Sequence, residues 1–287
     1  LDQTDVRRLH LVQSVPEDGS MRPIMHEYRY PFPGDKKPLA QLVIVDLKTG
    51  KVVVSDHRPI ISAFRGPIEM QKLQWAPDSS KVYLTDTDAT VTELSVTEIN
   101  AQTGKARVLV REKSDITYLP YHVLTDTSLV KILDNGDVIW PSERTGTMQL
   151  YLYDGKTGRQ KHSITSGDYI VREILQINNS SREIYFSAMN VENSNDPYYR
   201  AIYKVKADGS GLKRLTKEDM DHAVKPNHSL SMTTSSVERG FSSDGAYFVD
   251  AYSAADFPTK TVIRDNNGKE VMVLEQGKLT DDYKNYI

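Results

Sequence analysis

The stretch Asp46-Leu47-Lys48-Thr49-Gly50-Lys51 recurs as Asn100-Ala101-Gln102-Thr103-Gly104-Lys105 and as Asp154-Gly155-Lys156-Thr157-Gly158-Arg159. Two weaker copies follow, Ala207-Asp208-Gly209-Ser210-Gly211 and Asp265-Asn266-Asn267-Gly268-Lys269. The glycines at 50, 104, 158, 211 and 268 are 54, 54, 53 and 57 residues apart, which is too even for unrelated loops. Because Asp and Asn tolerate tight turns and Gly supplies a positive φ, we predict one hairpin built five times.

Strand-like runs lie on both sides of each turn. The runs before the turns are residues 41–45, 92–99, 150–153, 201–205 and 261–264, and the runs after them are 52–54, 108–110, 162–164, 212–215 and 271–274. Residues 92–99 alternate apolar and polar side chains, as in a strand with one face in a core. The pattern therefore predicts a β-hairpin around each copy.

A second strand–turn–strand element lies upstream of several of these hairpins. It is clearest at residues 75–83 and 241–248 and is degenerate at 134–140 and 178–186. One period then holds four short antiparallel strands, the content of a propeller blade of about 40–50 residues. We predict an all-β chain, a β-propeller of about five blade-sized four-stranded repeats forming a single domain over residues 1–287. A β-sandwich would not explain the even period. Short helical turns are expected only at residues 217–222 and 279–286.

Composition restricts the partners. The formal net charge of the 287 residues is -3, with 26% charged residues, so the chain lacks the positive field that nucleic-acid binding requires. Because the sequence has no Cys, it offers no disulfide, thiolate metal site or cysteine nucleophile. The absence of Cys is compatible with an oxidising compartment.

We assign no catalytic, cofactor-binding or metal-binding residue from the sequence. Residues 240–245, Gly-Phe-Ser-Ser-Asp-Gly, have the wrong spacing for a Gly-x-Ser-x-Gly elbow, and we interpret them as a blade turn. His222 and His228 lie near Asp219 and Asp221, but we interpret this stretch as a solvated loop rather than a metal site. No pair of carboxylates stands out as an acid/base couple.

Four strings carry a further resemblance. They are Tyr28-Arg29-Tyr30-Pro31-Phe32-Pro33-Gly34-Asp35-Lys36-Lys37-Pro38; Ser142-Glu143-Arg144-Thr145-Gly146; Thr165-Ser166-Gly167-Asp168-Tyr169-Ile170-Val171; and Phe241-Ser242-Ser243-Asp244-Gly245 followed by Tyr252, Ser253 and Pro258. In this order they resemble the N-terminal propeller domain of the dipeptidyl peptidase IV family, in the prolyl oligopeptidase clan of serine peptidases. Three positions depart from the family's pattern: Thr147 replaces an aromatic residue, Gln149 a His and Tyr169 a Trp.

The resemblance implies an eight-bladed propeller that caps an α/β-hydrolase domain and admits short peptides to a shared cavity. The family's Ser, Asp and His triad belongs to the hydrolase domain, which would begin after about Ile287. The family's Glu-Glu pair, which holds the substrate's amino terminus, lies before the segment matched by Leu1. The match therefore covers the later blades only, and no catalytic residue is carried over to this chain.

From this resemblance we expect the non-catalytic propeller domain of a periplasmic or extracellular serine exopeptidase. It would gate and orient peptides with a free N-terminus for release of dipeptides by a hydrolase domain of the same polypeptide, and the chain alone would be inactive. Missing blades would leave exposed edge strands, so we expect self-association, with a homodimer as one form. The alternatives are a stand-alone peptide- or protein-binding propeller and a five-bladed carbohydrate-active enzyme.

Overall fold

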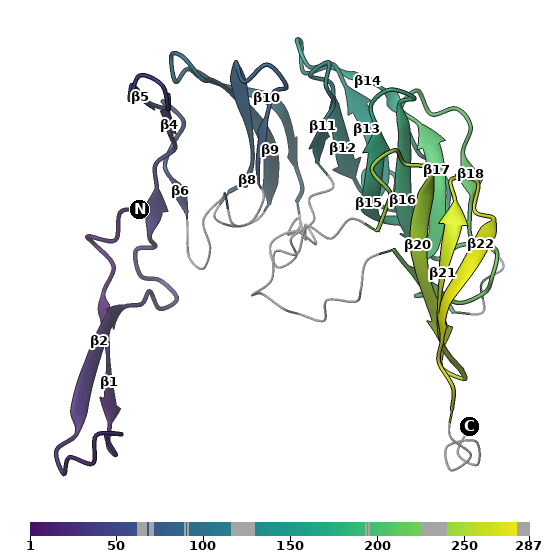
Figure 1. The fold of residues 1–287 in the computed structure, drawn as a ribbon. Helices are drawn as coiled ribbons and strands as arrows, with labels where there is room; N and C mark the ends of the chain where they lie inside the picture. Colours follow the sequence, from purple (N-terminus) through teal and green to yellow (C-terminus); the bar gives the residue numbers. More distant parts are fainter. Residues whose placement is uncertain are drawn as a thin grey trace. The chain divides into compact units, whose positions relative to one another are not determined.

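The computed structural model describes residues 1–61, 68, 72–88, 90, 92–115, 130–192, 194, 196–224 and 240–279. Within these ranges the regular structure consists of strands alone, β1 to β22 (Figure 1). The chain divides into two compact units, Leu1–Tyr118 and Leu119–Ile287.

In its described residues, unit 1 contains one four-stranded antiparallel sheet and three two-stranded ladders. The sheet has the order β10-β9-β8-β7, with β7 at Leu73–Trp75, β8 at Lys81–Thr87, β9 at Glu93–Asn100 and β10 at Ala106–Lys113. The ladders pair β1 (Arg8–Gln13) with β2 (Ile24–Arg29), β3 (Leu39–Ala40) with β6 (Ile60–Ile61), and β4 (Val43–Val45) with β5 (Val52–Val54). The first of the five predicted repeats is thus built from two-stranded ladders rather than from one four-stranded sheet.

The described part of unit 2 contains three four-stranded antiparallel sheets, each with its strands in sequence order. The first consists of β11 (Lys131–Ile132), β12 (Val138–Ser142), β13 (Gln149–Tyr153) and β14 (Gln160–Ser163). The second consists of β15 (Ile170–Asn178), β16 (Glu183–Met189), β17 (Ala201–Lys206) and β18 (Lys213–Arg214), and the third of β19 (Asp221–Ala223), β20 (Tyr247–Ala254), β21 (Phe257–Asp265) and β22 (Glu270–Gln276). The prediction of four short antiparallel strands per period is confirmed for these sheets.

The repeated turns have the same hydrogen bonds in each strong copy. The side-chain oxygens of Asp46, Asn100 and Asp154 each accept from the backbone N–H groups two and three residues later, at 2.8–3.0 Å. The glycines that follow have φ values of 70°, 73° and 67° at positions 50, 104 and 158. Local side-chain capping and a positive φ therefore form the hairpins, as the sequence predicts.

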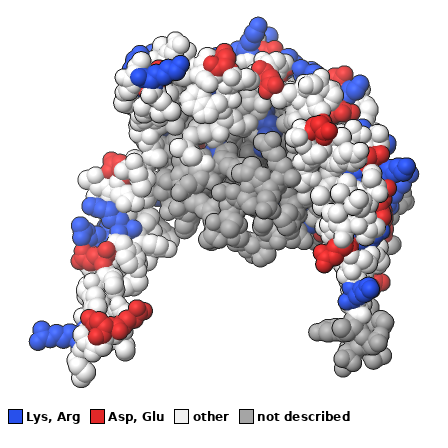
Figure 2. All heavy atoms as spheres, viewed as in Figure 1, with Lys and Arg blue, Asp and Glu red and all other residues white. Residues whose placement is uncertain are grey.

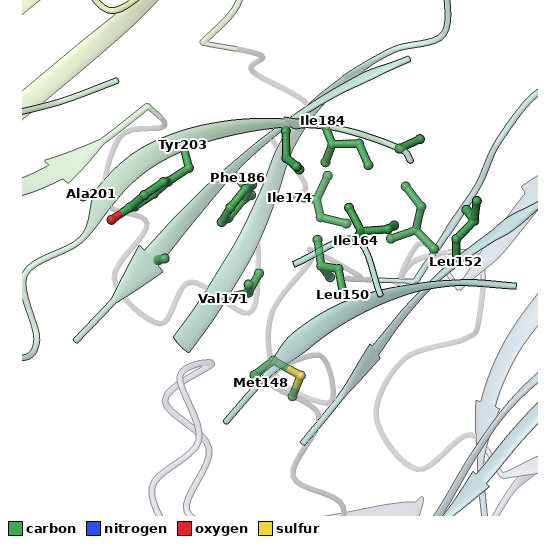
Figure 3. Close-up of a cluster of buried hydrophobic side chains, with 14 of the residues drawn as sticks. Met148, Leu150, Leu152, Ile164, Val171, Ile174, Ile184, Phe186, Ala201 and Tyr203 are labelled. Atoms are coloured by element: carbon green, nitrogen blue, oxygen red, sulfur yellow. The ribbon is translucent and has the colours of Figure 1, made fainter. Parts of the chain in front are cut away.

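The core lies between neighbouring sheets, because both faces of the inner strands are buried. In β16, Ile184 and Phe186 belong to one buried cluster with Leu150 and Leu152 of the sheet β11–β14 (Figure 3). The alternate side chain Tyr185 packs in a second cluster with Phe241 and Phe248 of the last sheet. Burying alternate faces against successive sheets is how a repeat without its own closed core gains stability.

One expectation was wrong. Lys217–Met220 has no helical turn, and residues 221–223 of the same stretch form strand β19. The second expected helical stretch, residues 279–286, lies outside the described residues apart from Leu279, which is not helical. Among the described residues, no helix has the length and apolar character needed to cross a membrane.

Candidate functional site

The serine-containing turn at residues 240–245 is engaged in its own hydrogen bonds. The Ser242 hydroxyl donates to Asp244 at 2.6 Å and accepts from the backbone N–H of Tyr247 at 3.0 Å. Phe241 is buried beside Tyr185 and Phe248, and Gly245 has a φ of 70°. These contacts form a turn that anchors the last sheet.

The residues around His222 diverge in space, although they are neighbours in sequence. Asp221 and His222 alternate along β19, so their side chains lie on opposite faces. Asp221 binds the guanidinium group of Arg200 through two bonds of 2.7 Å, and Asp219 accepts from Ser194 at 2.8 Å. Within the described ranges, no group of three or more His, Asp and Glu side chains could hold a metal ion, and His228 lies outside those ranges.

His222 instead belongs to a buried ionic network in the last sheet. Its Nδ1 atom lies 2.9 Å from Asp250, and its Nε2 atom lies 3.3 Å from the backbone carbonyl oxygen of Glu218. Arg264 donates to Asp250 at 2.7 Å, to the Glu218 carboxylate at 2.8 Å and to the Gly268 carbonyl at 3.1 Å. Burial opposes the charge of Arg264, but Glu218 and Asp250 outweigh this effect and raise the pKa of Arg264.

This network is suited to holding the sheet together rather than to catalysis. His222 and Asp250 are 1% and 0% exposed, and both ring nitrogens of His222 face acceptors rather than a hydroxyl nucleophile. The network instead fixes the segment before β19 against β20 and β21. These contacts are present where the sequence predicted a short helical turn, at residues 217–222.

The Ser142–Gly146 turn is held by Arg144. The guanidinium group donates to the Ser142 hydroxyl at 2.8 Å, to Gln160 at 2.7 Å and to the Tyr153 hydroxyl at 2.9 Å. It also lies 4.3 Å from the centre of the Tyr151 ring, in cation–π contact. Arg144 therefore ties the turn between β12 and β13 to β14.

The three departures from the family's pattern lie together. The buried Gln149 side chain donates to the Thr147 hydroxyl at 3.1 Å and to the Tyr169 carbonyl at 2.7 Å. The Tyr169 ring stacks on Tyr203 with centroids 5.5 Å apart. The three departures, which span 22 residues of sequence from Thr147 to Tyr169, thus lie in contact with one another. The sequence alone did not indicate this contact.

Unit 1 holds the candidate binding site, a polar pocket with a volume of about 370 Å³. One wall is the face of β9 and β10 that carries Glu93, Ser95, Thr97 and Arg111, and the other is the segment Asp56-His57-Arg58 after β5. None of these residues is recognisable as a site residue from the sequence, because the pocket exists only once distant segments pack together.

The surface charge agrees with the low net charge of the sequence. On the described part of the face in Figure 2, Lys and Arg side chains are interspersed with Asp and Glu side chains, without an extended basic patch.

Repeated four-stranded antiparallel sheets that pack face to face define this chain as a β-propeller protein. Residues 1–259 match the family described as "Dipeptidyl peptidase IV (DPP IV) N-terminal region", and the chain belongs to that family. The propeller and family predictions are therefore confirmed.

Two solved structures share the fold. A dipeptidyl aminopeptidase IV from Bacteroides ovatus superposes with a TM-score of 0.72 at 19% identity, covering 97% of this chain and 38% of that protein. Porphyromonas gingivalis dipeptidyl peptidase 4 superposes with a TM-score of 0.73 at 18% identity, covering 96% and 34%. The chain thus spans little more than a third of the length of these proteins.

Proposed function

We propose that the chain is the non-catalytic propeller domain of a dipeptidyl peptidase IV-like serine exopeptidase. The observation that carries this proposal is the family match over residues 1–259. The two solved structures, both named as dipeptidyl peptidases and both much longer than this chain, support it. The same match favours a peptidase over a stand-alone binding propeller or a carbohydrate-active enzyme.

In this proposal the propeller acts by exclusion and positioning. It limits access to an α/β-hydrolase domain of the same polypeptide and orients peptides with a free N-terminus, so that the hydrolase domain releases N-terminal dipeptides. Holding a substrate in reactive geometry lowers the entropic cost of reaction without any bond-making group on the propeller. The protein would act in the periplasm or outside the cell.

The first test is the intact mass of the native gene product in its source cells. We expect a product tens of kilodaltons heavier than this chain, continuing into a domain with a Gly-x-Ser-x-Gly motif. The full product should release dipeptides from a peptide with a free N-terminus, and this chain should not. A product ending at Ile287 would refute the proposal and favour a free-standing binding propeller.

Gating has its own test on the full product. An unstructured peptide and the same N-terminal sequence fused directly to a folded domain are compared as substrates. Exclusion by the propeller predicts release of the dipeptide from the free peptide alone. Equal cleavage of both substrates would contradict gating while leaving the peptidase assignment intact.

A further inference from the structure

The polar pocket of unit 1 is built by strand alternation and by one well-fixed segment. Glu93, Ser95 and Thr97 share one face of β9, and the register places Arg111 of β10 opposite Ser95. The segment at Asp56 is held against β10, since its backbone N–H donates to the Gly104 carbonyl at 3.0 Å and its carboxylate accepts from the Ala106 N–H at 2.6 Å. One backbone bond and one side-chain bond therefore fix the Asp56 wall against β10.

Two buried polar atoms from opposite walls of this pocket lack a protein partner. The Thr97 hydroxyl belongs to a side chain that is 1% exposed, and neither it nor Nδ1 of His57 has a hydrogen bond within the described structure. Leaving such groups unpaired costs free energy, so polar atoms in this position favour a bound partner. The interfaces between sheets in unit 2 are instead filled by apolar side chains.

The remaining polar groups determine what kind of partner fits. Both carboxylates of the pocket are paired with donors: Glu93 pairs through Oε1 with Nε of Arg111 at 3.2 Å, and Asp56 pairs with the Ala106 N–H and with Lys105. The guanidinium groups are occupied only in part, because the described bonds of Arg58 all run through Nη2, to Asp86 and to the Thr87 carbonyl, and the described ion pair of Arg111 runs through Nε. The pocket thus offers N–H and O–H donors from Arg58, Arg111 and Thr97 to an acceptor-rich ligand.

We propose that this pocket binds the carboxylate of a small organic acid, with Arg111, Arg58 and the Thr97 hydroxyl as donors. A planar carboxylate matches the fork of a guanidinium group. The volume favours an organic body over a bare inorganic ion, since about 370 Å³ is the space of about a dozen liquid waters. This site goes beyond the proposed peptidase function, because it needs neither a peptide substrate nor a hydrolase domain.

The test is calorimetric titration of the 287-residue chain with succinate and, separately, with inorganic phosphate at matched ionic strength. Thr97→Val and Arg111→Gln remove one donor each, and Arg159→Gln removes an exposed guanidinium group in unit 2 as the control. We expect succinate to bind, and each pocket variant to raise its Kd about tenfold or more, the typical effect of losing a charge-assisted or buried hydrogen bond. The control should bind like the original chain.

Thr97→Val also separates a binding role from a structural one. Because Val is nearly isosteric and the hydroxyl is unpaired, the ligand-free variant should unfold at the same or a higher temperature than the original chain. No succinate binding, or equal binding by Thr97→Val and Arg159→Gln, would overturn the proposal. Binding of phosphate without succinate would also overturn it, and would assign the pocket to an inorganic anion.

Discussion

The glycines of the repeated turns allow a positive φ, and some of them also leave room for the backbone of the preceding sheet. Only the first role is visible in the sequence. Gly50 and Gly104 have nearly the same φ, 70° and 73°. A Cβ atom at Gly50 would meet open space, whereas one at Gly104 would collide with the backbone carbonyl of Val54 at the end of β5. A Cβ atom at Gly268 would likewise collide with the backbone carbonyl of Leu215, and one at Gly209 would make a tight contact of 3.1 Å with the carbonyl oxygen of Ser163. The turn of one sheet therefore rests against the outer strand of the preceding sheet.

This difference predicts unequal costs for the same substitution. Gly50→Ala should lose about 1–2 kcal/mol of unfolding free energy, the strain of a side chain in the left-handed region. Gly104→Ala should lose about 1–3 kcal/mol more, because the backbone must also shift away from Val54. Urea unfolding of both variants gives the comparison, and equal losses would show that the contact with Val54 is not maintained in solution.

A second residue-level prediction concerns acid. Hydrogen bonds from the backbone N–H and the hydroxyl of Thr157, and from the N–H of Lys156, lower the pKa of Asp154 from 3.8 to about 2. The stability it contributes is therefore present above pH 3.8 and is lost as the pH falls through about 2. Asp154→Asn keeps the acceptor, as Asn100 does in the equivalent turn. As the pH is lowered from 3.8 to about 2, the urea midpoint of Asp154→Asn should fall less than that of the original chain. Equal falls of the two midpoints would show that the Asp154 carboxylate does not stabilise the turn.

At the scale of an element, residues 217–222, which lead into β19, show why a local sequence pattern can mislead. Residues 217–222 have an acidic, helix-compatible composition, but their bonding partners are distant in sequence: Arg264 for Glu218, Asp250 for His222 and Arg200 for Asp221. These contacts override a weak helical preference. The hairpins, in contrast, depend on bonds within a few residues, so their positions could be predicted from sequence. The pocket could not be predicted, because its donors come from segments 39 and 53 residues apart, from Arg58 to Thr97 and from Arg58 to Arg111.

The same network supports a stability prediction. Asp250→Asn removes the carboxylate charge that contacts both His222 and Arg264, which are 1% and 3% exposed. The buried guanidinium group of Arg264 then has less negative charge beside it. We expect a loss of about 3–5 kcal/mol of unfolding free energy, the cost of breaking a buried ion pair on one side. Asp256→Asn, an exposed carboxylate between β20 and β21, should change stability by less than about 0.5 kcal/mol. Similar midpoints for the two variants in urea would show that the network does not stabilise the last sheet.

At the scale of the whole molecule, the repeat leaves outer strands without a covering partner in the described structure. Strand β22 is the edge of the last sheet, and its four central side chains remain about half exposed: Val271 54%, Met272 55%, Val273 48% and Leu274 50%. In unit 1, Val43, Val45, Val52 and Val54 form cross-strand pairs on one exposed face of the β4–β5 hairpin. Sheets inside the repeat cover such faces with a neighbour, as the cluster between β11–β14 and β15–β18 shows. Apolar exposure at the outer strands therefore follows from the repeat architecture.

An exposed apolar edge strand is a template for pairing with another chain, so we expect the isolated chain to self-associate with rising concentration. Met272→Lys together with Leu274→Lys should weaken this association, because each Lys keeps the strand extended but places a charge that a second edge cannot bury. Gln276→Lys, on the same strand but outside the apolar run, adds a charge as the matched control. Sedimentation velocity across a wide concentration range measures the effect. A strictly monomeric original chain would contradict an open apolar edge, and equal association of the double variant and the control would place the contact elsewhere, with the exposed face of β4–β5 as the next surface to alter.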